Sequence, residues 1–332
     1  MFKLGFIGLN GHYSAVMRGI PARQDARLAA VATSDENALE RAKKFEAADS
    51  NTGFYTEYRE MLEREELDIV TVCLSDGERA QVLQDCANAG AHIISEKPLT
   101  MNFEELSAVR KAIADNGVRL SMLLTMRFEG AYLAVREIVK SGAIGEVIQM
   151  ASQKSYKLGQ RPEWMKSRDT FSGTIPYIGI HSIDLMRWTS GHEFAAVAAF
   201  QSNVAHPENR DMEDNATVAL QMDNGGTAVA RLDYLRPPSA PTHGDATLRL
   251  AGSKGIIEVT NDSRDVMLVT ENQPPEPVAI PPSISFLDDF LDSLEGDHEN
   301  LVSAEDAFRL TEICFKAREA AQKREIVSLL RI

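Results

Sequence analysis

The sequence has few cysteines, and none is placed for a disulfide framework or a thiolate metal site. Cys73, Cys86 and Cys314 are odd in number and show no C-x-x-C spacing, which argues against both arrangements. Free cysteines of this kind are mostly small core residues. We therefore expect a protein of a reducing compartment that has no metal site.

Long apolar runs and an excess of positive charge are also missing. No stretch approaches eighteen consecutive apolar residues, and the first residues, MFKLGFIGLNG, have neither the apolar region nor the cleavage site of a signal peptide. Lysine and arginine number 35 against 49 aspartates and glutamates, and the net charge of -14 repels phosphate backbones and anionic lipids. We expect a cytoplasmic protein that binds neither nucleic acid nor membrane.

The chain is long enough for two domains, with 332 residues of which 44% are hydrophobic. Residues 1–123 alternate strand-like and helix-like segments, a pattern typical of a doubly wound parallel sheet, the Rossmann fold. The expected strands are Lys3–Gly8, Leu28–Ala32, Ile69–Leu74, His92–Ser95 and Arg119–Leu123. The expected crossover helices are Ser14–Ile20, Glu36–Phe45, Glu57–Glu63, Arg79–Ala89 and Glu104–Ala114.

Residues 124–332 predict a second α/β domain with a large, mostly antiparallel open sheet. A helix at Ala131–Lys140 precedes a long strand at Glu146–Tyr156, and six further strand-like runs follow between Phe194 and Thr270. The proline-rich segment Pro274–Pro282 predicts a loop, and the last two helices are expected near Ser285–Leu294 and Ala304–Gln322. If helices cover one face of this sheet, the other face is free to pair with a second subunit in a homodimer or homotetramer.

The first strand-to-helix turn, Gly8-Leu9-Asn10-Gly11-His12-Tyr13, partly matches a dinucleotide-binding fingerprint. Gly8 supplies the tight turn, Asn10 tolerates a left-handed backbone, and Gly11 lets the chain approach a pyrophosphate. About twenty residues later, Thr33-Ser34-Asp35 stands where an acid would bind the adenosine ribose. Thr33 takes the expected acidic position and Asp35 follows closely, so both NAD and NADP remain open.

The tripeptide Glu96-Lys97-Pro98 ends the fifth expected strand. Ligands of an open parallel sheet bind beyond the carboxyl ends of its strands, and the residue before a proline is kept extended. We therefore expect Lys97 to reach the ligand cleft. A partly desolvated ammonium there binds a substrate hydroxyl and favours its deprotonated form.

A second set of polar side chains lies in the segment from Gly173 to Asp184, which predicts a helix with Pro176 in its first turn. At about 100° per residue, Tyr177, His181 and Asp184 fall within roughly 60° of one another. One face of an otherwise apolar helix therefore carries three titratable groups, although a histidine on such a helix can also be a hydrogen-bonded core residue.

Together these motifs resemble the Gfo/Idh/MocA family of oxidoreductases, and the resemblance covers nearly the whole chain. It rests on Gly8 and Gly11, Ala89-Gly90-Ala91-His92 before Glu96-Lys97-Pro98, Met126-Arg127-Phe128, Gly142-Ala143-Ile144-Gly145-Glu146, and Gly179-Ile180-His181-Ser182-Ile183-Asp184. It implies a Rossmann domain, an α/β domain with an open sheet, and hydride transfer between NAD(P) and a sugar, inositol or related polyol. Lys97 and His181 match the catalytic lysine and histidine of the family.

The sequence departs from the family pattern at three places. Ser75-Asp76-Gly77 replaces the usual Thr-Pro-Asn beside the cofactor, Asn10 replaces the middle glycine, and Tyr177 stands where many members have an aspartate. The residues expected at the cofactor are Gly8, Asn10, Gly11, His12, Thr33, Ser34, Asp35, Ser75, Asp76, Glu96 and Lys97.

In the expected mechanism, Lys97 polarises the reacting oxygen and His181 is the general acid/base, because the ordinary pKa of histidine lies near neutrality. Asp184 orients His181 or binds a substrate hydroxyl, and Arg127 and Trp164 are expected to contact the substrate. The identity of the base has two alternatives, and the function has two alternatives to a dehydrogenase.

Either Tyr177 and Lys97 form an acid/base couple, or His181 acts alone as the base. One alternative function is an epimerase or lyase that oxidises its sugar only transiently and retains its NAD. The other is a non-catalytic sensor that binds a dinucleotide.

Overall fold

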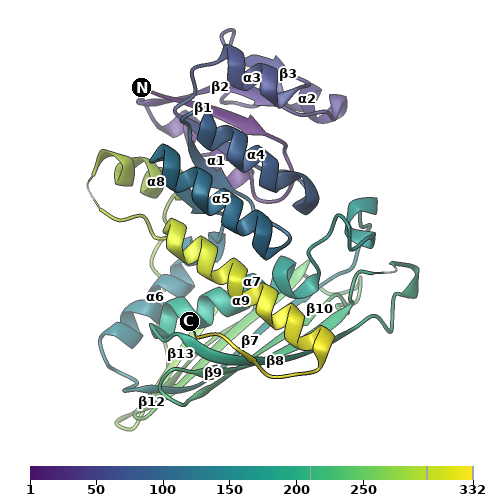
Figure 1. Cartoon of the computed structure of the whole chain (residues 1–332). Helices are drawn as coiled ribbons and strands as arrows, with labels where there is room; N and C mark the ends of the chain where they lie inside the picture. Colours follow the sequence, from purple (N-terminus) through teal and green to yellow (C-terminus); the bar gives the residue numbers. More distant parts are fainter. Residues whose placement is uncertain (210, 297, 331–332) are drawn as a thin grey trace. The chain divides into compact units, whose positions relative to one another are not determined.

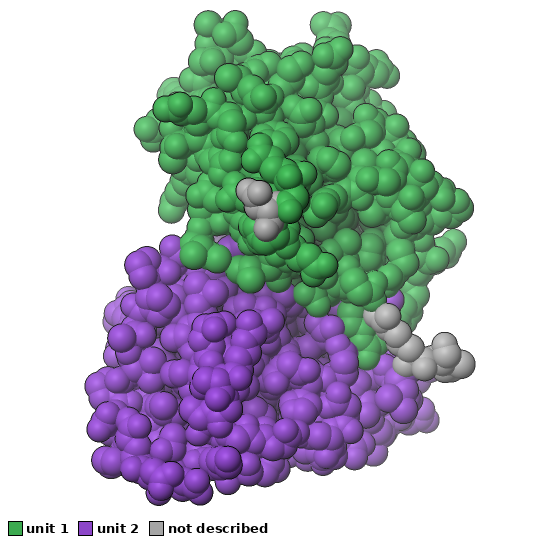
Figure 2. Space-filling view, turned by 90° about the vertical axis from the view of Figure 1, so that its left-hand side faces the viewer, with its two compact units in different colours: residues 1–125, 284–309 green, residues 126–283, 310–332 purple. Residues whose placement is uncertain are grey.

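The computed structural model describes residues 1–209, 211–296 and 298–330, which form two compact units (Figure 1, Figure 2). Unit 1 comprises Met1–Thr125 and Ile284–Arg309, and unit 2 comprises Met126–Ser283 and Leu310–Ile332. The first boundary lies close to the expected division after residue 123. The later boundaries differ from a division into two consecutive domains, because the chain returns to unit 1 at Ile284.

Unit 1 contains a six-stranded parallel sheet in the order β3-β2-β1-β4-β5-β6, which confirms the predicted Rossmann fold. Its strands are β1 (Phe2–Ile7), β2 (Ala26–Ala32), β3 (Gly53–Tyr55), β4 (Ile69–Val72), β5 (His92–Ser95) and β6 (Leu120–Met122). The three-residue strand β3 was not expected, because so short a segment carries no readable alternation. The strand order reverses between β1 and β4, which is where ligands bind in folds of this kind.

The helices of unit 1 largely follow the predicted crossovers. They are α1 (Ser14–Met17), α2 (Glu36–Ala42), α3 (Tyr58–Arg64), α4 (Asp76–Asn88), α5 (Phe103–Asn116) and α8 (Phe286–Glu295). The first helix ends earlier than expected and continues as a 3-10 turn at Ile20–Ala22. Pro21 explains the change, because a proline has no N–H to donate within a continuing helix.

Unit 2 contains a nine-stranded sheet in the order β14-β13-β12-β11-β7-β10-β9-β8-β15. Its strands are β7 (Val147–Tyr156), β8 (Phe194–Ser202), β9 (Asn215–Met222), β10 (Thr227–Asp233), β11 (Gly244–Gly252), β12 (Gly255–Thr260), β13 (Asp265–Thr270), β14 (Gln273–Pro277) and β15 (Val327–Ser328). Only β7 and β10 pair in parallel among the described strands of this sheet, so the predicted, mostly antiparallel sheet is confirmed.

The expectation of a loop throughout Pro274–Pro282 is wrong at its start. Gln273–Pro277 forms β14, which pairs with β13 at one end of the sheet. Prolines are accepted in such a position because an edge strand has one side without ladder hydrogen bonds. In the sequence the prolines indicate a loop, because nothing shows that this segment forms the edge strand of the sheet.

Helices α6 (Gly130–Lys140) and α7 (Ile180–Ser190) pack on one face of this sheet (Figure 1). Helix α9 (Ala304–Lys323) begins in unit 1 and continues in unit 2. In the part of the chain that the structure describes, no helix is both long and apolar enough to cross a membrane.

The opposite face of the nine-stranded sheet carries small, polar and scattered apolar side chains. The strand register aligns one row of them, Phe200, Thr217, Arg231, Gln153 and Thr247. Phe200 is 70% exposed at one end of this row. Such an uncovered face stays in water or pairs with another surface.

Candidate functional site

The turn after β1 has the backbone geometry of a dinucleotide-binding loop. Gly8 and Gly11 have φ angles of 73° and 63°, a region that glycine adopts without steric cost. A Cβ on Gly8 would lie 2.5 Å from the carbonyl oxygen of Cys73, and one on Gly11 would lie 2.2 Å from Glu96 Oε1. The N–H of Asn10 donates to the same Cys73 oxygen at 2.9 Å. Neither glycine therefore has room for a side chain.

Glu96 connects this turn to the end of β5. Its Oε1 accepts hydrogen bonds from the backbone N–H of His12 and, at 2.6 Å, from the His12 ring, while Oε2 accepts from the Lys97 N–H at 2.9 Å. Burial by itself would raise the pKa of the Glu96 carboxyl, but His12, Lys97 and Arg79 outweigh burial and hold that pKa well below its usual range. Glu96 is therefore a carboxylate that fixes the turn, and it pairs with His12, a second predicted cofactor residue.

A cavity of about 400 Å³ lies beyond the end of β2, where a Rossmann fold binds adenosine. The predicted residues Thr33 and Ser34 line it. Asp35 does not, because its carboxylate caps α2 by accepting from the N–H groups of Asn37 at 2.9 Å and Ala38 at 3.1 Å. Capping by aspartate is a strong local preference, and it gives Asp35 a partner other than a ribose.

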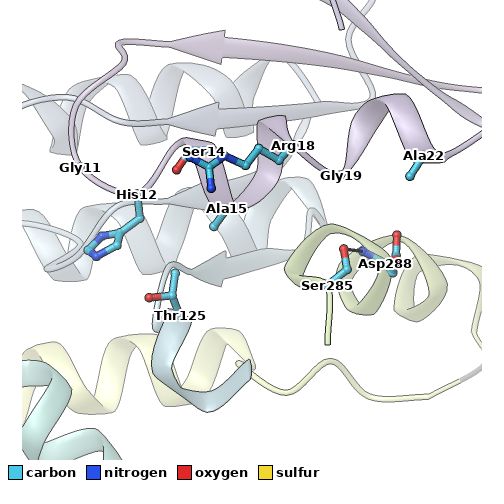
Figure 3. A pocket seen from close by; sticks show the side chains of 10 residues that line it. All are labelled: Gly11, His12, Ser14, Ala15, Arg18, Gly19, Ala22, Thr125, Ser285 and Asp288. Carbon is cyan, nitrogen blue, oxygen red and sulfur yellow. Dashed lines mark hydrogen bonds between the residues drawn. The ribbon is translucent and has the colours of Figure 1, made fainter. Parts of the chain in front are cut away.

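A second cavity, of about 580 Å³, lies along α1 (Figure 3). It is lined by Gly11, His12, Ser14, Ala15, Arg18, Gly19, Ala22, Thr125, Ser285 and Asp288. This cavity includes Gly11 and His12 of the glycine turn, the first cavity includes Ile7 just before the turn, and both cavities belong to unit 1.

The residues that replace the family's Thr-Pro-Asn run have structural partners. Asp76 is fully buried and forms an ion pair of 3.1 Å with Arg79, which also donates to the carbonyl oxygens of Leu74 and Pro98. Ser75 donates to the Glu78 side chain. The Asp76–Arg79 pair therefore ties the start of α4 to the segment after Lys97.

Lys97 lies at the end of β5, as predicted, and is 3% exposed. The sequence alone leaves an exposed lysine at this strand end possible, but the structure places Lys97 among buried groups. A lysine so placed has lost most of its hydration, which is the condition under which an ammonium binds an oxygen substituent strongly.

In unit 2 the expected helix begins irregularly. Residues Ile175–Gly179 form a π-helical turn before α7, in place of regular α-helix. Pro176 lacks the N–H that a regular turn uses, and π turns are frequent at functional sites. The single regular helix expected across Tyr177 and His181 is therefore not formed.

Tyr177 packs in an aromatic cluster with Trp164 and Phe171. The ring centroids lie 5.9 Å apart for Tyr177 and Trp164, 5.3 Å for Tyr177 and Phe171, and 5.9 Å for Trp164 and Phe171, all in edge-on geometry. Such pairs contribute packing free energy beyond their buried area. The predicted residues Tyr177 and Trp164 are thus brought together, and Phe171 was missed because its loop shows no periodic pattern.

Asp184 and Arg127 are also brought together, by an ion pair that the sequence did not suggest. Arg127 Nη2 lies 2.6 Å from Asp184 Oδ1, Nε donates to both carboxylate oxygens at 3.0 and 3.1 Å, and each side chain is 1% exposed. The guanidinium also lies 5.5 Å from the Trp188 ring. His181, 4% exposed, lies on the same helix as Asp184. Contacts of Arg127 and Asp184 with substrate stay a prediction.

The three cysteines are free and buried, as predicted. Burial raises the pKa of each thiol, so all three remain protonated and unreactive. Among the described residues, no group of three or more histidines, cysteines, aspartates or glutamates is placed to hold a metal ion.

Two family models match the chain. Residues 2–124 match a model described as an oxidoreductase family with an NAD-binding Rossmann fold, and residues 132–258 match the GFO/IDH/MocA C-terminal domain. A solved structure of an oxidoreductase from Thermotoga maritima is 32% identical, with a TM-score of 0.92 and coverage of 98% of this chain and all of that one. The chain belongs to the Gfo/Idh/MocA oxidoreductase family.

More distant Gfo/Idh/MocA relatives include named dehydrogenases. The myo-inositol 2-dehydrogenase of Thermotoga maritima is 25% identical over 275 residues, 82% of this chain and 79% of the relative. The oxidoreductase YrbE of Bacillus subtilis is 26% identical over 210 residues, but the match spans 59% of its length. The family match confirms an NAD-binding Rossmann domain in unit 1.

This geometry predicts that Gly8→Ala abolishes dinucleotide binding. The new Cβ meets the Cys73 carbonyl at a backbone conformation that alanine rarely adopts, so the turn must shift. We expect the Kd for NADH, followed by fluorescence titration, to rise by about a hundredfold or more, since phosphate binding depends on the aligned N–H groups of the turn.

Gly90→Ala is the matched control. Gly90 has a φ of 80°, but nothing lies within 4 Å of its Cβ position, so it carries the same backbone strain without the clash. The assignment of the turn is refuted if Gly8→Ala binds NADH as the wild-type protein does.

Proposed function

We propose that this protein is an NAD-dependent dehydrogenase that oxidises a secondary alcohol of a sugar, inositol or related polyol. The observation that carries the proposal is the link through Glu96, whose carboxylate binds both His12 in the dinucleotide turn and the backbone of the buried Lys97. This link supports a position of Lys97 beside the bound cofactor, where its ammonium can act on the substrate. The inositol 2-dehydrogenases among the relatives support the substrate class.

The residues present fit a bound dinucleotide. Gly8 and Gly11 give the turn the positive φ angles of a tight dinucleotide-binding turn, and Thr33 and Ser34 offer hydroxyls in the cavity after β2. When bound, the nicotinamide ring accepts or returns the hydride.

The chain itself supplies binding and proton transfer. Lys97 binds the reacting oxygen through its ammonium and stabilises negative charge there. His181 accepts the hydroxyl proton during oxidation and returns it during reduction. A screen of sugars and polyols with NAD⁺ and NADP⁺ tests this proposal, and the absence of any oxidised substrate counts against it.

We further propose that the cofactor is NAD rather than NADP. The charged residues lining the cavity after β2 are both carboxylates, Glu57 and Glu78, with no lysine or arginine among them. A 2′-phosphate placed there would be repelled. We expect the Kd for NADH to be about tenfold or more below that for NADPH in fluorescence titrations.

Glu57→Lys should narrow this difference, because it reverses one of the two charges. Glu63→Lys makes the same change in net charge, on helix α3 that Glu57 precedes, but outside the cavity lining, and should leave the ratio unchanged. Equal wild-type affinities for the two cofactors, or equal effects of the two variants, would contradict the preference for NAD.

We also propose that the uncovered face of the nine-stranded sheet joins two copies of the chain, as a homodimer or as part of a homotetramer. Phe200, exposed at the end of its row, would be buried in such an interface. Light scattering at micromolar concentration should show an oligomer, and Phe200→Asp should dissociate it. A monomeric wild-type protein refutes this arrangement.

A further inference from the structure

Lys154 places a cation where the described part of the chain offers it no counter-charge. The residue lies on β7 and is 8% exposed. Across the described residues, its ammonium makes no hydrogen bond or ion pair with the chain, and its nitrogen lies 5.5 Å from the centroid of the Tyr156 ring. A lysine side chain that is mostly buried and has no counter-charge among the described residues costs free energy, so its presence needs a reason.

The strand register places Lys154 beneath the π-helical turn that leads to His181. Its cross-strand neighbours are Leu232 on β10 and Ala246 on β11, both buried. Leu232 packs against Gly179, because a Cβ built there would lie 2.6 Å from Leu232 Cδ1. Gly179 stands two residues from Tyr177 and two from His181. Lys154 therefore belongs to the part of unit 2 that carries the proposed base.

A second cation, Arg161, is connected to Lys154 through the rings of Tyr156 and Tyr234. Arg161 packs its guanidinium 4.5 Å from the centroid of the Tyr234 ring, and the rings of Tyr234 and Tyr156 lie 6.4 Å apart. Its Nη2 donates to the Lys157 carbonyl at 3.0 Å, but its buried Nε has no hydrogen-bond partner among the described residues. Lys154, Tyr156, Arg161 and Tyr234 form what we call the cationic cluster.

The carboxylates at this end of the sheet are engaged elsewhere. Asp233 accepts from Ser155 Oγ at 2.6 Å, and it alternates with Leu232, so it points to the other face. Asp245 lies 3.5 Å from Arg236, and Asp262 accepts from the backbone N–H of Ala246 at 3.2 Å. These carboxylates therefore form no ion pair with the cluster among the described residues, and an anionic ligand can take that place.

We propose that the cationic cluster binds an anionic group of the substrate, a carboxylate or a phosphate monoester on a polyhydroxy compound. The substrate is then a sugar acid or a sugar phosphate rather than a neutral polyol. This inference rests on the proposed dehydrogenase function and names the substrate class of the same site.

Lys154→Met tests the proposal, because methionine keeps most of the side-chain length and removes the charge. The measurement is calorimetric binding of gluconate, glucuronate, glucose 6-phosphate and glucose to the NADH-saturated protein. We expect the wild-type protein to bind at least one anion more tightly than glucose, and Lys154→Met to weaken that binding by about tenfold to a hundredfold. Gluconate and glucuronate report on a carboxylate, and glucose 6-phosphate on a phosphate.

Lys140→Met, on the exposed face of α6, removes the same charge and should change nothing. Thermal unfolding gives a second readout: Lys154→Met should keep or raise the Tm, because it removes an uncompensated buried charge. The anion site is overturned if no anion binds more tightly than glucose, or if Lys154→Met binds anions as the wild-type protein does. Anion binding that depends on Lys154 without oxidation of any of these compounds would instead count against the dehydrogenase function.

Discussion

Lys97→Ala should lower kcat by about a hundredfold or more while leaving the Kd for NADH nearly unchanged. The loss of one oriented electrostatic group at the reacting atoms typically has an effect of this size. Lys97 is buried, and the adjacent Glu96 is bonded to the backbone and ring of His12 in the glycine turn. We therefore expect the turn, and with it the cofactor affinity, to persist without the ammonium. Steady-state kinetics and NADH titration measure the two quantities separately.

Two further variants isolate the chemistry from folding. Lys97→Met fills more of the buried space than alanine does, and it should be as inactive as Lys97→Ala if the charge is what matters. Lys111→Ala removes an exposed lysine of α5 and should be fully active. Near-normal kcat in Lys97→Ala would remove this residue from the mechanism.

His181→Ala should lose about a hundredfold or more of kcat, the usual contribution of a general acid/base. Tyr177→Phe should retain most of it. The phenol ring packs against Trp164 and Phe171, and phenylalanine keeps those contacts. A phenol is also a poor base at neutral pH, since its ordinary pKa is about 10.

The same pair of variants discriminates the tyrosine-lysine couple from a histidine base. If Tyr177→Phe loses most of its kcat with unchanged NADH affinity while His181→Ala stays active, Tyr177 and Lys97 carry the proton transfer. If both variants lose activity, their pH profiles decide, because only removal of the true base abolishes the limb of kcat that this base controls.

The fold was predictable because local patterns determine most of it. Alternating strands and helices indicated the parallel sheet of unit 1, and β5 matches its expected bounds, His92–Ser95. The error at Gln273–Pro277 arises because the position of a segment in the whole sheet determines whether it can form a strand. The prolines of Gln273–Pro277 are compatible with a strand only at an edge, and the sequence does not reveal which strand is last.

The sequence indicates candidate site residues, which stay a prediction, but it does not indicate the contacts among them. The motif containing Lys97 is visible in the sequence, whereas the pairing of Arg127 with Asp184 joins residues 57 positions apart and depends on tertiary packing. Asp35 was expected at the cofactor, but its carboxylate caps the start of α2. Lys154 carried a readable signal: it follows Met150 and Ser152 on the buried side of an expected strand, where a lysine is unusual.

Net hydride transfer from substrate to cofactor can be followed directly with deuterium-labelled substrates. The purified protein is incubated with excess NAD⁺ and a panel of sugars, polyols and their acids carrying deuterium at the secondary C–H, and both products are quantified. We expect reduced cofactor and ketone in equal amounts, over many turnovers, with deuterium in the cofactor. Conversion of the sugar without accumulation of reduced cofactor, or tight cofactor binding without conversion of any substrate, would contradict net hydride transfer.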